Sequence, residues 1–122
     1  MDLNELAGLG RISKEIEPIK NVKIKVHSLT VKEEEEIYSS LASVPDDALV
    51  KTSTLQIETL VRAIETINGE KFREIDVLKT YLKGLQRHVL SLIWQSWMKE
   101  IEDPSIKEIE ALKKNSEILK VA

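Results

Sequence analysis

The stretch DVLKTYLKGLQRHVLSLIWQSWMKEI, residues 76–101, is the longest segment of the chain with periodic apolar residues. Apolar side chains recur there at intervals of three and four residues, which is typical of one face of an α-helix. A second apolar stripe adjoins the first in the C-terminal half. We therefore predict one long helix that must be covered on two sides, by its own chain or by a partner. The first stripe comprises Leu78, Leu82, Leu85, Val89, Leu92 and Ile93, and the second comprises Leu90, Trp94, Trp97 and Ile101.

The composition indicates one soluble domain. A chain of 122 residues with 42% hydrophobic and 32% charged residues suits a single domain with a modest core, and 4% aromatic residues make that core aliphatic. The net charge of −3 argues against a nucleic-acid partner, because such proteins usually carry a strongly basic face. The absence of cysteine excludes disulfides, cysteine nucleophiles and thiolate metal sites.

No apolar run approaches the roughly 18–20 residues that a membrane-spanning helix needs. The first residues are acidic where a secretory signal peptide would be basic. We therefore expect an intracellular protein with no membrane partner.

Residues 1–20 are weakly patterned, because Gly8, Gly10 and Pro18 interrupt any regular element. They are interpreted as a flexible N-terminal arm. The alternative is an arm that becomes ordered when it docks on a partner.

Residues 21–27, NVKIKVH, alternate strictly between apolar and polar side chains. This period of two predicts a half-buried strand, with His27 on the polar face. An isolated strand cannot satisfy its own edges, so we expect residues 71–75 (KFREI), after the turn at residues 68–69, to pair with it. Pairing with a partner chain is the alternative.

A capping box at Thr30 and Glu33 predicts the start of a helix over residues 31–43. Residues 33–36 are all glutamate and point around the whole helix, so they fit a solvated helix start better than a metal site. Pro45 opens a second helix, which we expect to run to Ile67. We expect that helix to be continuous, with a weak point at residues 51–54; the alternative is a restart at Ser53, which could cap a new beginning.

The predicted fold is mainly α, a small four-helix domain with a minor two-stranded β element near the N-terminal half. Asp76 is expected to cap the long helix, and Asp103 with Pro104 to end it and start the last one. The predicted organisation is a flexible arm over residues 1–20, a helical core domain over residues 21–103 and a C-terminal helix over residues 104–122.

The sequence offers no catalytic, cofactor-binding or metal-binding constellation. His27 and His88 lack a second ligand at helical spacing, and a packed or surface role suits both better than catalysis. Glycine-rich phosphate loops and strained Gly-x-Ser-x-Gly turns are absent from the sequence. We therefore expect a non-enzymatic protein without cofactors, with an undetected acidic catalytic site as an open alternative.

The main interaction candidate is the tryptophan pair in the long helix. Either both rings fill the core, or one of them anchors a partner, since Trp and Met are enriched at interfaces. Helical spacing alone does not distinguish these cases. If a working surface exists, we expect it here, unless the C-terminal helix folds back over it. The predicted partner-binding residues are Leu90, Trp94, Trp97, Met98 and Ile101.

Two short patterns carry a family resemblance. Residues 22–42, VKIKVHSLTVKEEEEIYSSLA, join a strand directly to an acidic helix, and residues 60–72, LVRAIETINGEKF, end a later helix with an Ala-Ile-x-x-Ile-Asn-Gly-Glu pattern. Over roughly residues 20–100 the chain resembles the tail assembly chaperones and baseplate (hub) assembly proteins of tailed bacteriophages. Its tryptophan-containing helix and charged C-terminal helix depart from that pattern.

The resemblance implies a non-enzymatic protein of virion morphogenesis, an assembly chaperone or a structural hub component. Its partners would be other tail or baseplate proteins, such as tape measure or hub components. It would work in the host cytoplasm or remain in the virion tail. A homo-oligomer is a further expectation. The alternative function is a small regulatory adaptor that binds a host or phage protein.

Overall fold

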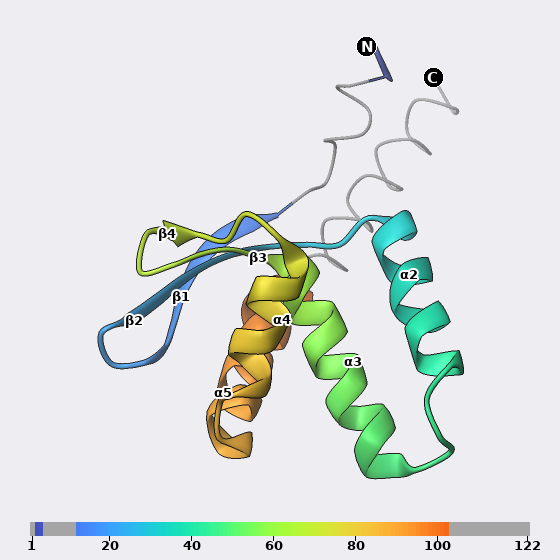
Figure 1. Ribbon diagram of the computed structural model, residues 1–122. Helices are drawn as coiled ribbons and strands as arrows, with labels where there is room; N and C mark the ends of the chain where they lie inside the picture. Colours follow the sequence, from blue (N-terminus) through green and yellow to red (C-terminus); the bar gives the residue numbers. More distant parts are fainter. Residues whose placement is uncertain (1, 4–11, 103–122) are drawn as a thin grey trace.

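The computed structural model describes residues 2–3 and 12–102. Within them four α-helices accompany a four-stranded antiparallel sheet, so the fold is mixed α/β (Figure 1). The prediction of a mainly α domain with a two-stranded element is wrong. The elements are β1 (Ser13–Ile19), β2 (Val22–His27), α2 (Val31–Ala42), α3 (Ala48–Ala63), β3 (Ile64–Ile67), β4 (Glu70–Lys71), α4 (Ile75–Lys83), α5 (Arg87–Trp97) and the π-helix η1 (Met98–Glu102).

The strand predicted over residues 21–27 is confirmed as β2, but its neighbours differ from the expectation. The sheet order is β1-β2-β3-β4, so β2 pairs with β1 and β3 rather than with residues 71–75. Strand β1 occupies residues that we had placed in the N-terminal arm. Its only buried side chain is Ile16, and Pro18 lies where the β1–β2 register shifts. Because most of β1 is polar, its alternation gives little signal.

Strand β3 occupies the four residues that we had predicted as the end of the second helix. Ile64 and Ile67 are both buried, although they are three residues apart and would normally face opposite sides of a strand. A register shift explains this, since Ile24 pairs with Ile67 while Val26 pairs with Ile64. The bulge thus produces a helix-like spacing inside a strand, which misled the prediction.

The Asn68-Gly69 turn joins β3 to β4 instead of ending a helix. Both residues have positive φ, 50° and 81°, as a two-residue hairpin turn with the twist of its strands requires. Asn68 also extends the sheet, because Lys23 N–H donates to its side-chain oxygen at 2.8 Å and its own N–H donates to the Lys23 carbonyl at 2.7 Å.

The predicted long helix is two helices. Helix α4 ends at Lys83 with Gly84 as its C-cap, and α5 begins at Arg87 after an extended Gln86. The N-cap of α4 is Glu74 rather than Asp76, and it makes no side-chain capping bond. After the break α5 runs back to the sheet and contacts β1 (Figure 1).

The core lies between the sheet and α3, α4 and α5. Its fully buried members come from β2, α3, α4 and η1, so the helices share one apolar layer with the inner face of the sheet. They are Ile24, Val26, Leu60, Leu82 and Ile101. Helix α2 lies outside this layer and packs against α3 (Figure 1). No helix in the described ranges is both long and apolar enough to cross a bilayer.

Candidate functional site

The residues predicted to bind a partner divide into two groups. Leu90, Trp97 and Ile101 are buried in the core, with exposed fractions of 7%, 3% and 0%. The indole N–H of Trp97 donates to the backbone oxygen of His27 at 3.2 Å, which ties α5 to the end of β2. Leu90 and Ile101 belong to the core, whereas Trp97 belongs to the core and also lines the hollow that Trp94 and Met98 border.

Trp94 and Met98 are half-buried and line a groove of about 300 Å³ between α2, α3, α5 and η1. The Trp94 ring packs against Trp97 at a centroid distance of 5.6 Å, so a core side chain holds it in place. We call this hollow the tryptophan groove. Its apolar lining comprises Leu29, Ile37, Tyr38, Leu55, Trp94, Trp97 and Met98.

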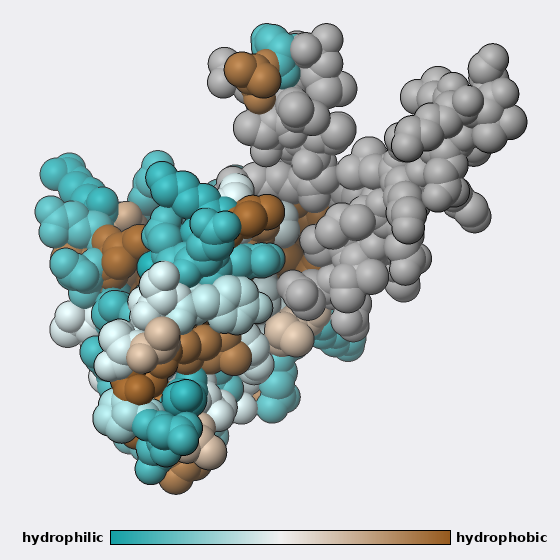
Figure 2. All heavy atoms as spheres, turned by 90° about the vertical axis from the view of Figure 1, so that its right-hand side faces the viewer, coloured by the Kyte–Doolittle hydropathy of each residue, from teal (hydrophilic) through white to brown (hydrophobic). Residues whose placement is uncertain are grey.

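The rim of the tryptophan groove is partly exposed and acidic. Tyr38 lies on α2 with 66% of its surface exposed. Glu34 lines the groove on the same helix. Figure 2 views the molecule from the side on which α2 lies and shows hydrophobic areas interleaved with hydrophilic ones. An apolar floor with an acidic rim suits an apolar side chain flanked by positive charge.

A second, larger hollow of about 560 Å³ lies among α2, α3, α4 and α5. We call it the basic pocket. Its wall combines three cations with side-chain hydroxyls, and the principal members are Ser43, Ser53, Thr54, Lys79, Lys83 and Arg87.

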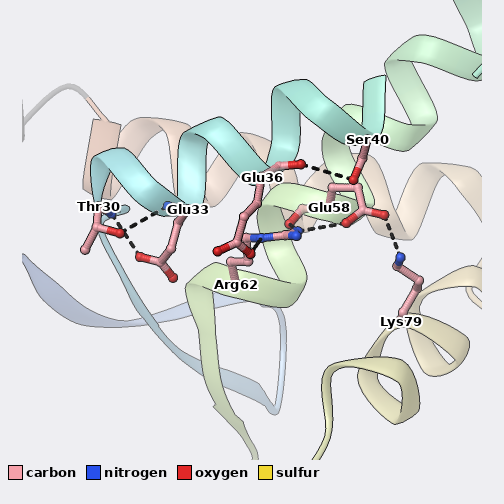
Figure 3. A network of polar contacts seen from close by, with 7 residues as sticks. All are labelled: Thr30, Glu33, Glu36, Ser40, Glu58, Arg62 and Lys79. Carbon is pink, nitrogen blue, oxygen red and sulfur yellow. Dashed lines mark hydrogen bonds and ion pairs between the residues drawn. The ribbon is translucent and has the colours of Figure 1, made fainter. Parts of the chain in front are cut away.

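A buried ion-pair network connects three of the helices (Figure 3). Glu58 on α3 accepts from Arg62 at 2.7 Å and pairs with Lys79 on α4 at 2.6 Å. Arg62 also reaches Glu36 on α2 at 3.4 Å. Burial alone would raise the pKa of Glu58, but the hydrogen bonds and positive charges of Arg62 and Lys79 outweigh it and hold that pKa below its usual value.

The two histidines have different surroundings. His27, predicted on the polar face of its strand, is instead 7% exposed, and its ring Nδ1 lies 2.7 Å from the Ser28 carbonyl oxygen. His88 is exposed at the start of α5. Among residues 2–3 and 12–102, no three His, Asp or Glu side chains are grouped to hold a metal ion.

Sequence reasoning missed the basic pocket and the Glu58 network. The i,i+4 spacing of Glu58 and Arg62 inside an apolar helical run was a usable signal for the network. The pocket cations Lys79, Lys83 and Arg87 also follow i,i+4 spacing, but the walls that α2 and α3 contribute have no signal in the sequence. Comparisons with protein-family models, with curated proteins and with solved structures find no match to this chain.

Proposed function

We propose that the protein is a non-enzymatic binding protein that acts in the assembly of a bacteriophage tail or baseplate, as a chaperone or hub component. The observation that carries the binding role is the tryptophan groove. It presents two large apolar side chains, Trp94 and Met98, on a floor fixed by the core. Such preorganised aromatic anchors contribute most of the energy at protein interfaces.

The phage assignment rests on the resemblance of residues 22–42 and 60–72 to tail and baseplate assembly proteins. The first segment comprises β2, the Thr30 capping box and α2. The second runs from the end of α3 through β3, the β3–β4 turn and β4. Of the two segments, the first contains α2, which forms one wall of the tryptophan groove.

The partner that suits this groove is an amphipathic helix of another tail protein, such as a tape measure or hub component. Its apolar side chains would contact Trp94 and Met98, and a basic residue beside them would face Glu34. A second copy of this chain is the other occupant that the proposal allows.

The test is direct binding of the purified chain to the tape measure and hub proteins of its phage. Trp94 lines the groove, so a titration followed by tryptophan fluorescence reports occupancy directly. Tyr38→Ala removes an exposed ring from the groove and is expected to weaken binding about tenfold. Tyr81→Ala is the matched control, because this tyrosine is 46% exposed on α4 outside the groove lining.

Equal weakening by both tyrosine variants would remove the groove from the interface. A pull-down from infected cells that recovers no tail component would contradict the phage role. Recovery of a host regulatory protein with the same dependence on Tyr38 would favour the alternative, a small regulatory adaptor.

A further inference from the structure

The basic pocket has a feature that the tryptophan groove lacks, namely cations without carboxylate partners. Lys83 makes no ion pair, and Arg87 bonds only to a hydroxyl, within the ranges 2–3 and 12–102. Both line the hollow. In a chain of net charge −3 this is a local concentration of positive charge inside a concave surface.

Glu58, the carboxylate that lines the pocket, does not neutralise these two cations. Its oxygens are engaged by Arg62 at 2.7 Å and by Lys79 at 2.6 Å. The positive charge of Lys79 is therefore balanced by Glu58, whereas the charges of Lys83 and Arg87 are not balanced by this carboxylate.

Arg87 is held in position for an incoming group. One of its terminal nitrogens donates to Ser53 Oγ at 3.1 Å, which fixes the guanidinium against α3 and leaves its other N–H donors available. Ser53 still has its own hydroxyl proton to donate, and Thr54 adds another hydroxyl to the wall.

The location of Arg87 is electrostatically unfavourable without a bound anion. It is the first residue of α5, where the helix dipole is positive, and neither a capping side chain nor an acidic residue occupies the first turn. A cation at this end is destabilised, whereas an anion there interacts with the dipole and with Arg87 together.

The remaining wall is apolar and partly exposed. Leu49 and Val50, on the first turn of α3, are 70% and 40% exposed, and both line the hollow with Val44. A volume of about 560 Å³ also exceeds what a bare inorganic anion fills and lies in the usual range for small-molecule pockets.

We propose that the basic pocket binds a small organic oxyanion, with its phosphate or carboxylate on Lys83, Arg87 and Ser53 and its apolar body on the α3 wall formed by Leu49 and Val50. Arginine binds either oxyanion through paired N–H donors. This site is separate from the tryptophan groove and does not depend on the phage assignment.

The experiment is calorimetric titration of the full chain with phenyl phosphate, benzoate and inorganic phosphate. We expect saturable one-to-one binding of at least one organic anion, tighter than that of inorganic phosphate. Lys83→Gln and Arg87→Gln should each weaken it at least about tenfold, because each removes a charge-assisted hydrogen bond. Preference for phenyl phosphate assigns a phosphate ligand, and preference for benzoate assigns a carboxylate.

Matched controls separate a site from general attraction. Lys32→Gln and Arg73→Gln make the same charge changes at exposed positions outside the pocket and should leave affinity within about twofold. All four positions are exposed, so the thermal unfolding midpoints should stay close to that of the parent protein. Absence of saturable binding, equal losses in the controls, or equal affinity for inorganic phosphate would overturn the proposal.

Discussion

Helices α2 and α5 are similar in length, 12 and 11 residues, but different interactions hold them in place. Helix α2 begins with a complete capping box and buries a single residue, Ile37. Helix α5 has no side-chain cap and buries three residues, Leu90, Ile93 and Trp97. The position of α2 is therefore encoded locally, whereas that of α5 depends on the sheet and helices that surround it.

The same difference between α2 and α5 also gives the two helices different positions in the tryptophan groove. Helix α5 contributes most of its apolar residues to the core, leaving Trp94 half-buried beside the groove and Leu92 40% exposed. Helix α2 buries few of its side chains and leaves Val31 and Tyr38 exposed. A helix attached at one side can form the wall of a groove, and a helix inside the core fixes its floor.

The strongest test of this comparison uses two isoleucines with equal exposure. Ile93 on α5 and Ile37 on α2 are each 3% exposed, but only Ile93 belongs to the core cluster. Ile93→Ala is expected to lower the free energy of unfolding by about 4 kcal/mol, and Ile37→Ala by about half as much, because a side chain beside an open groove leaves a smaller cavity. Urea unfolding measures both, and equal losses would refute the distinction.

The ion-pair network offers a second, smaller contrast. Glu58→Gln removes the central charge from Arg62 and Lys79 and should cost about 3 kcal/mol. Glu36→Gln removes only the outer contact, whose carboxylate side chain is 46% exposed, and should cost less than about 1 kcal/mol. Chemical denaturation of the two variants gives the comparison, and similar costs would show that the network is not centred on Glu58.

The same network predicts a pH dependence. The folded-state pKa of Glu58 lies below its ordinary value of 4.5, so its contribution to stability is fully present above about that pH. It is lost as the pH falls further, through the folded-state pKa. Below pH 4.5 the parent protein should therefore lose stability more steeply than Glu58→Gln. Parallel curves would contradict the cause assigned to this shift.

Capping gives the smallest expected effect. Thr30→Ala removes the side-chain bond to the Glu33 amide and should destabilise the protein by about 1 kcal/mol. Gln86→Ser supplies α5 with the cap that it lacks and should stabilise it by about 0.5 kcal/mol. Thermal unfolding should shift in opposite directions, and an unchanged midpoint for Thr30→Ala would mean that α2 is not held locally.

The success of the sequence-based predictions also depends on whether an element is specified locally, as α2 is, or by tertiary contacts, as α5 is. The Thr30 capping box and α2 are confirmed, as are strand β2 and the continuity of α3 through residues 51–54. These elements are specified by neighbouring residues. Strand β1 and the break at residues 84–86 were missed, because pairing with β2 defines the former and packing of α5 on the sheet forces the latter.

The candidate site could be predicted only in part. Trp94 and Trp97 lie one turn apart, and helical spacing cannot tell which ring faces the core. The hydrogen bond from Trp97 to the His27 carbonyl decides it, and this contact joins residues 70 positions apart. Lys79, Lys83 and Arg87 are spaced four residues apart, which favours one helical face, but the sequence does not show that α2 and α3 form the other walls of their pocket.

The arrangement of the sheet has a consequence for how the chain folds. The sheet contains two hairpins, β1–β2 and β3–β4, each closed by a two-residue turn. Each hairpin can form fast because its paired residues are close in the sequence. Strands β2 and β3 meet only when α2 and α3, inserted between them, have closed a long loop. Closing this loop costs conformational entropy, and that cost arises before the contacts between β2 and β3 can contribute favourable energy. We therefore expect pairing of β2 with β3, across the bulge, to be the slowest step in forming the sheet.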